Sequence, residues 1–89
     1  MSWAVEVDPD VWSVDTIRLP DSERAAVRNT IESWIEPPEA ITTLQAGRIV
    51  QEFHMANGIV IKFVTDEDDA DGGLLQVIRV MIRNWFPSD

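Results

Sequence analysis

Two runs of alternating hydrophobic and polar residues, on either side of Ala56-Asn57-Gly58, dominate the pattern of this chain. They span Arg48 to Thr65, and such alternation around a glycine-containing turn predicts a β-hairpin. With a three-residue loop and Gly58 in the left-handed region, one face carries the pairs Met55–Ile59, Phe53–Ile61 and Gln51–Phe63. The opposite face then pairs His54 with Val60, Glu52 with Lys62 and Val50 with Val64.

The alternative is a two-residue Asn-Gly turn, which would oppose Phe53 to Lys62 and so mix the two faces of the hairpin. A slip of one residue exchanges core for solvent, and we therefore favour the three-residue loop. In that register the face buried against a helix is predicted to consist of Ile49, Phe53, Met55, Ile59, Ile61 and Phe63.

The first twenty residues predict a short strand and a second, less regular segment. Trp3–Val7 alternates, with its apolar side chains on one face. Asp8-Pro9 follows as an N-cap with proline at the first helical position, which predicts a helix over residues 10–19. Several β-branched residues in this segment leave an extended conformation open, and Pro20 ends it.

An amphipathic helix is predicted next, starting at Asp21 or Ser22. Its apolar stripe repeats at helical spacing, and its polar residues fall on the other side. Pro37-Pro38 ends the helix, and Trp34 on the stripe is interpreted as a core residue. The stripe consists of Val27, Ile31, Trp34 and Ile35.

After the helix, residues 39–47 are read as a connection to the hairpin, and residues 66–73 as a solvated acidic loop. The last predicted strand, Leu74 to Ile82, is rich in valine, isoleucine and leucine, as is typical of a central strand. Its even positions Leu74, Ile78, Val80 and Ile82 are expected to be buried, and its odd positions to face outward. The tail from Arg83 to Pro87 ends the chain's single domain, residues 1–89.

Together these elements predict an α+β fold of two layers. An N-terminal strand and one or two helices precede a three-stranded antiparallel meander, β-α-(α)-β-β-β, with a helix covering one face of the sheet.

Composition excludes several classes of protein. The net charge is −9, with 16 acidic and 7 basic residues, which opposes direct binding to a nucleic-acid backbone. The chain has no cysteine, and therefore no disulfide framework or thiol nucleophile. No signal peptide or membrane span is visible, so a cytoplasmic protein with no membrane contact is expected.

Motifs for cofactors or metals are also missing, and no cofactor or metal is expected. The segment from Glu67 to Gly72 resembles the opening of a calcium loop, but Ile78 stands where the bidentate glutamate should be. His54 is the only histidine and cannot form an ordinary zinc site without further ligands. No phosphate-binding glycine motif or serine-nucleophile motif is present.

The candidate site is the polar face of the hairpin together with the odd face of the last strand. General acid–base chemistry would use its cationic and basic groups; the catalytic candidates are His54, Lys62, Arg79 and Arg83. This face also carries more apolar surface than a monomer normally exposes, so we expect it to bind a partner. The predicted partner-binding residues are Val50, Glu52, His54, Val60, Lys62, Val64, Val77, Arg79 and Met81.

The order of elements resembles that of the RelE/ParE-type toxins of bacterial toxin–antitoxin systems. The similarity lies in the opening W-x-V-x-V, in I-x-L-P-x-x-x-R-x-x-V from Ile17, in Leu44-x-x-Gly47 and in V-I-R-V-x-I-R from Val77. It implies a toxin paired with a small antitoxin. Members that cleave messenger RNA are usually basic, whereas this chain is acidic, has no tyrosine and has Val60 near the position of a typical arginine.

The resemblance therefore favours the ParE type, which acts on its target by protein contact. We expect a toxin-like protein-interaction module; if it is an enzyme, it would be a ribonuclease. The alternative is an acidic, non-enzymatic inhibitor or immunity-type protein that binds a basic partner. The alternative would use the acidic loop, with Asp66, Glu67, Asp68, Asp69 and Asp71; a homodimer is the third option for the partner.

Overall fold

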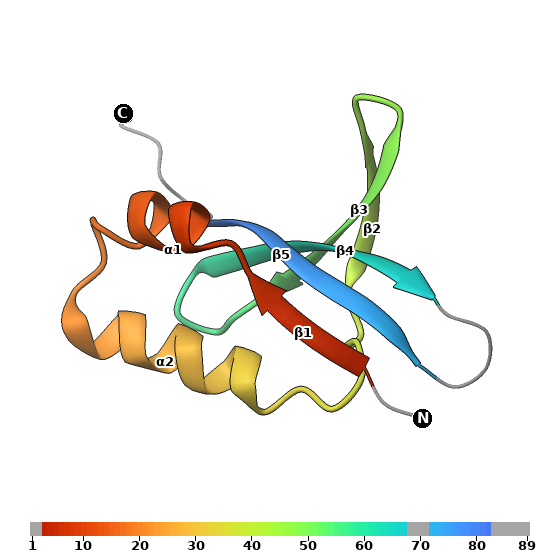
Figure 1. Ribbon diagram of the computed structural model, residues 1–89. Coiled ribbons are helices and arrows are strands. Elements are labelled where there is room, and N and C mark those ends of the chain that lie inside the picture. The colour runs from red at the N-terminus through yellow and green to blue at the C-terminus, as the bar shows by residue number, and fades with distance from the viewer. Residues whose placement is uncertain (1–2, 68–71, 83–89) are drawn as a thin grey trace.

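The computed structural model describes residues 3–67 and 72–82, which form two helices and a five-stranded mixed sheet (Figure 1). The order of strands in the sheet is β1-β5-β4-β3-β2, with β1 parallel to β5 and the other neighbours antiparallel. The elements are β1 (Trp3–Val7), α1 (Pro9–Asp15), α2 (Asp21–Glu32), β2 (Ile41–Gln45), β3 (Arg48–His54), β4 (Ile59–Glu67) and β5 (Gly73–Ile82).

The predicted α+β class is confirmed, but the three-stranded meander is wrong because a further strand precedes it. The segment read as a connection contains β2, which pairs with β3 through a tight turn at Ala46-Gly47. Both turn residues have positive φ, 51° and 78°, as in the two-residue turns that match strand twist. The helices therefore precede a meander of four strands.

The predicted register of the β3–β4 hairpin is confirmed from Gln51–Phe63 to His54–Val60. Gly58 has a φ of 90°, and the Met55 amide donates to the Ile59 carbonyl at 2.8 Å, which closes the three-residue loop. The ladder extends no further than Gln51, so the predicted Val50–Val64 pair is not formed. Ile49, predicted to be in the core, is 65% exposed and lies beyond the end of this ladder, where β3 no longer pairs with β4.

Helix α1 is shorter than the sequence predicts. The Asp8 carboxylate accepts a hydrogen bond from the Asp10 amide at 2.8 Å, and Pro9 occupies the first turn, as expected of an N-cap. The helix nevertheless ends at Asp15, and Ile17, which lies beyond it, is 71% exposed. The β-branched residues therefore shorten the helix without making the segment extended.

Helix α2 begins at Asp21 as predicted but ends at Glu32, before the double proline. Pro37 excludes Glu36 from the helical region, which helps to explain the early end. Trp34 still reaches the core, with its ring 5.4 Å from that of Phe53, whereas Ile35 is 83% exposed. The predicted stripe is therefore correct for Val27, Ile31 and Trp34 only.

Strand β5 changes which side chains it turns toward the helices along its length. An irregularity opposite Lys62 and Phe63 makes Ile78 an extra residue, since Phe63 pairs with Val77 and Lys62 with Arg79. Before the bulge, odd residues face the core, and Leu75 and Val77 are 0% and 1% exposed. The prediction that the even positions are buried is therefore confirmed for Val80 only; Leu74, Ile78 and Ile82 are partly buried, and of these Ile82 packs against the core.

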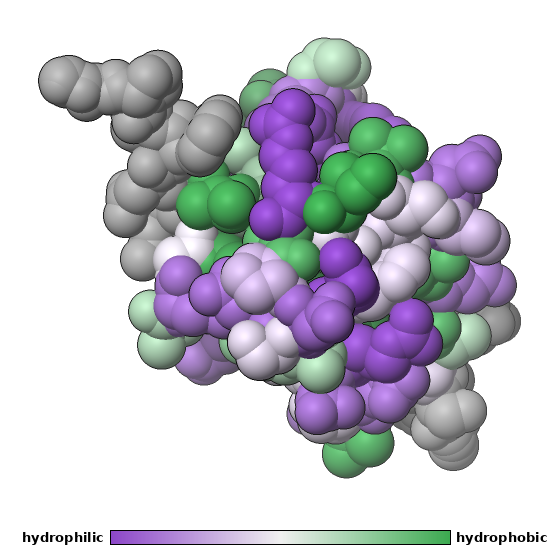
Figure 2. Space-filling model, turned by 90° about the vertical axis from the view of Figure 1, so that its left-hand side faces the viewer, coloured by the Kyte–Doolittle hydropathy of each residue, from purple (hydrophilic) through white to green (hydrophobic). Residues whose placement is uncertain are grey.

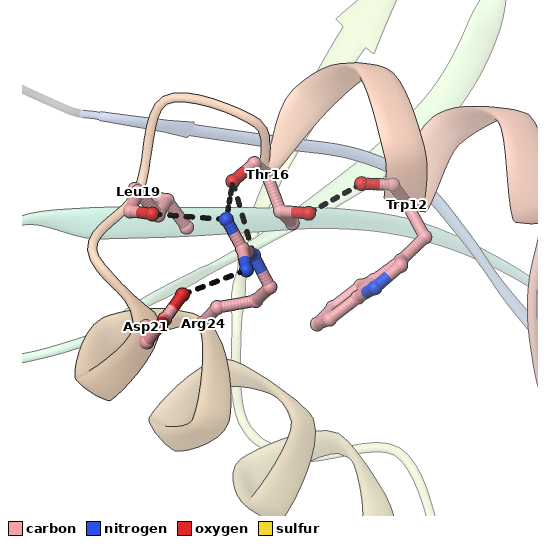
Figure 3. Close-up of polar contacts among 5 residues, drawn as sticks. All are labelled: Trp12, Thr16, Leu19, Asp21 and Arg24. Carbon is pink, nitrogen blue, oxygen red and sulfur yellow. Dashed lines mark hydrogen bonds and ion pairs between the residues drawn. The ribbon is translucent and has the colours of Figure 1, made fainter.

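The two helices are joined by the Arg24 side chain (Figure 3). Its guanidinium donates to the Thr16 carbonyl, from both Nε and Nη2 at 3.3 Å, and to the Leu19 carbonyl at 3.1 Å. Nη1 also binds the Asp21 carboxylate at 3.0 Å. Arg24 thus binds two carbonyl groups of the segment between the helices, of which that of Thr16 also accepts the Leu19 amide at 3.0 Å.

The core lies between α2 and one face of the sheet, the core face. Its buried residues come from both helical and strand segments: Leu19, Val27, Ile31, Ile59, Ile61, Phe63, Leu75, Val77 and Val80. The other side of the sheet, the outer face, has no helix over it in Figure 1. In the part of the chain that is described, no helix is long and apolar enough to cross a membrane.

Candidate functional site

Three polar side chains meet on the outer face of β3 and β4: Glu52, His54 and Lys62, hereafter the outer-face triad. The register that places Phe53 against Ile61 in the core turns these neighbours to the other side. Glu52 lies between its two companions, 3.1 Å from His54 Nε2 and 3.7 Å from Lys62 Nζ. Sequence reasoning predicted that these residues share one face, and the structure confirms it.

The triad is largely withdrawn from water. The side chains of Glu52, His54 and Lys62 are 18%, 28% and 17% exposed. Each oxygen of the Glu52 carboxylate has its own partner, one for the imidazole and one for the ammonium group. Both oxygens of the Glu52 carboxylate are therefore bound by side chains of the protein, and this carboxylate balances the charge of the partly buried Lys62.

Arg79 is an exposed cation of this face and stands opposite Lys62 on β5. Its side chain is 61% exposed, and its Nε lies 3.8 Å from Asp15 Oδ2. The same Asp15 oxygen accepts a hydrogen bond from the Val80 amide at 2.8 Å. Since β1 ends at Val7, opposite Val77, Asp15 supplies an acceptor to the part of β5 beyond β1.

The charges in the middle of the outer face are balanced within the chain. Lys62 and Arg79, the two cations in the middle of the outer face, each face a carboxylate. A phosphate backbone would have to displace those carboxylates to gain their charge. Among the described residues, no group of three or more histidines and acids is placed to hold a metal ion.

The apolar part of the predicted site is less available than expected. Val50, Val60 and Val77 are buried within the chain, at 2%, 4% and 1% exposed. The bulge in β5 turns Val77 to the core face, where it joins the core cluster. Of the predicted apolar contacts, Val64 is half-buried and Met81 is 36% exposed.

The start of β3 lies over the outer face. Arg48, at the start of β3, lines a hollow of about 650 Å³ with Glu6, Gln76 and Ile78. Strand β4 separates β3 from β5 in the sheet, so Arg48 reaches this hollow only by passing over β4. The chain thus covers part of its own outer face, which the strand pattern did not reveal.

Several predicted residues fall outside the described ranges. Arg83 and the acids Asp68, Asp69 and Asp71 belong to these, as does most of the calcium-like segment. Asp66 and Glu67 of the acidic segment are described, and both are exposed at the end of β4.

Asp15 is the residue of this region that sequence reasoning missed. Its position at the last residue of a short helix is unfavourable for a carboxylate, because the dipole is negative there. The sequence carried no signal of this mismatch, because the predicted helix ran to residue 19 and placed Asp15 within it.

The side of the molecule that carries the helices has a mixed surface. Figure 2 shows hydrophilic residues between separate hydrophobic patches on this side.

Comparison with known proteins returns no matching family model, no similar curated protein and no similar solved structure.

Proposed function

We propose that this chain is a small toxin-like protein-interaction module of the toxin–antitoxin type, which acts by contact through the outer face of its sheet. The observation that carries the proposal is the charge balance of that face. Lys62 and Arg79 are already paired with carboxylates, so the face favours a protein surface over RNA. The net charge of −9 supports the same conclusion.

Contact residues for such a partner are those that remain accessible beside the triad. Arg79 and Met81 are exposed on β5. On the other side, Glu39 and Ile41 line a shallow hollow with Glu52 and His54. Polar groups flanked by aliphatic ones are typical of protein interfaces, in which arginine and methionine are enriched.

Inducible expression in a bacterial host tests the proposal. We expect expression of the chain to arrest growth, and co-expression of the gene next to its own to relieve the arrest. Arg79→Gln should weaken the arrest, whereas Arg18→Gln, the same change at an exposed turn on the helical side, should not. Normal growth with abundant folded protein would contradict the proposal.

A ribonuclease is the enzymatic alternative, with His54 and Lys62 as its acid–base groups. It predicts that purified protein degrades RNA and that His54→Gln abolishes both degradation and growth arrest. A contact mechanism predicts that the purified protein leaves RNA intact, both with and without the change His54→Gln. The pairing of both residues with Glu52 favours the contact mechanism.

The non-enzymatic alternative is an acidic inhibitor or immunity-type protein. The exposed Asp66 and Glu67 at the end of β4 favour it, because they begin the most acidic stretch of the chain. It predicts no growth arrest, and a complex with a basic protein that dissociates as salt increases. Asp66→Asn combined with Glu67→Gln should weaken that complex, while Arg79→Gln should not.

A further inference from the structure

We propose that the free edge of β2 is a self-association surface, through which two copies of this chain pair antiparallel into one continuous sheet. Among the described strands, β2 and β1 form the two edges of the sheet. Such edges present unpaired backbone groups that template further strands, and proteins usually protect them with charges or prolines.

The two edges differ in this respect. Strand β1 carries Glu6, exposed in the middle of the edge. Self-pairing of β1 would bring like charges together, which is unfavourable. Strand β2 reads ITTLQ, with no charge and no proline, and Arg48 is the one charged residue between Ala40 and Gln51. In a chain with 16 acids, this edge lets two copies approach without opposing acids.

The surface next to this edge is apolar. Leu44 and Ile49 are paired across β2 and β3, and they are 71% and 65% exposed. Both lie near the turn of the β2–β3 hairpin. The pair is thus accessible to a second molecule in a region where neither helix contributes cover.

An antiparallel pairing centred on Thr43 satisfies these features together. It places Thr43 opposite Thr43 of the second copy, and such threonine pairs stabilise sheets. Leu44 then lies opposite Thr42, and the two Leu44 side chains become diagonal neighbours at roughly 7–8 Å. With Ile49 beside each leucine, four aliphatic side chains that are exposed in the monomer form one cluster. This self-complementarity identifies a second copy as the occupant.

Sedimentation velocity tests the association between about 1 µM and 1 mM protein, the range expected of a small interface. We expect a monomer–dimer equilibrium that strengthens with salt, because salt screens the repulsion between two chains of net charge −9. Leu44→Lys should weaken dimerisation at least tenfold. Ala4→Lys, the same added charge at the exposed β1 edge, should leave it unchanged.

Disulfide trapping tests the register, because the natural chain has no cysteine. Thr43→Cys should form a covalent dimer on mild oxidation, since the two Cβ atoms would be roughly 5 Å apart. Gln45→Cys should not, because the two positions would be separated by about four residues along the strands, or roughly 13 Å. A monomer at every concentration, with no trapping at Thr43, would overturn the proposal. That outcome would leave growth arrest, the test of the proposed function, unaffected.

Discussion

Replacing Asp15 by alanine gives the most direct test of how α1 is attached to the sheet. Asp15 is 13% exposed, and its Oδ2 accepts the Val80 amide at 2.8 Å. Val80 is 2% exposed, so water has little access to replace the lost acceptor. Alanine removes this acceptor and leaves a buried donor unpaired in a strand that β1 no longer accompanies.

The magnitude follows from three contributions. A hydrogen bond to a charged group contributes about 1.5–3 kcal/mol. The ion pair with Arg79 adds only a few tenths, since that side chain is 61% exposed and screened by solvent. Removing a carboxylate from the C-terminal end of α1 returns about 0.3–1 kcal/mol. We therefore expect Asp15→Ala to lower the free energy of unfolding by about 2 kcal/mol.

Thermal or urea unfolding measures the effect, and hydrogen exchange locates it. A loss of about 2 kcal/mol in a domain of this size lowers Tm by roughly 8–16 °C. If Asp15→Ala destabilises the structure only around Val80, the amide hydrogen of Val80 should exchange with solvent roughly thirtyfold faster than in the natural chain. Asp15→Asn keeps an acceptor and should cost about half as much.

Asp10→Ala is the matched control, since Asp10 is an exposed acid in the first turn of the same helix. It should cost less than about 1 kcal/mol through the helix dipole and leave Val80 protected. If Asp15→Ala and Asp10→Ala had equal effects, or if the exchange of Val80 did not change, the assigned role of Asp15 would be refuted.

Three other changes test the core, the helix junction and the hairpin turn by urea unfolding. Phe63→Ala removes a ring with 0% exposure and should lower the free energy of unfolding by about 3–5 kcal/mol, with loss of near-ultraviolet circular dichroism. A loss below about 1 kcal/mol would contradict the place of this ring in the core. Arg24→Lys keeps the charge but loses the planar guanidinium group that binds the Thr16 and Leu19 carbonyls, and should lower the free energy of unfolding by about 1–2 kcal/mol. Unchanged stability would show that a positive charge alone is enough to hold the helix junction. At Gly58 an added Cβ has no heavy atom within 4 Å, but alanine must adopt a φ of 90° there, so Gly58→Ala should lower the free energy of unfolding by about 1–2 kcal/mol. An unchanged midpoint of urea unfolding would argue against strain in this turn.

Much of the fold could be predicted because its signals are local. The Asp8-Pro9 start of α1 and the apolar stripe of α2 depend on residues within one or two turns of each other. The β3–β4 register depends on alternation and on the conformation of Gly58. Strand β2 was missed because its polar threonines, which favour strands, do not alternate clearly with apolar residues.

The candidate site could be predicted only in part. The outer-face triad followed from the hairpin register, because residues two apart on a strand share a face. The apolar surface around it did not, since Val77 changes face through a bulge whose cause lies in the pairing of β4 with β5. Val50 and Val60 are buried at 2% and 4% exposed, and Arg48 reaches a hollow beside Gln76 on β5; neither feature is encoded in a local pattern.

By itself, the sequence determined the β3–β4 hairpin with its register from Gln51 to His54, and the amphipathic helix before the meander, but it left residues 10–19 open between helix and strand. Alternation, helical spacing, caps and turn glycines are properties of neighbouring residues, and they survive whatever the rest of the chain does. The tertiary structure decided the pairing of β1 with β5, the bulge at Ile78 and the use of Asp15 as an acceptor for Val80. Asp15 and Val80 are 65 residues apart in the chain. Their contact depends on how the whole chain packs, because an unpaired strand amide takes whichever acceptor the fold brings to it.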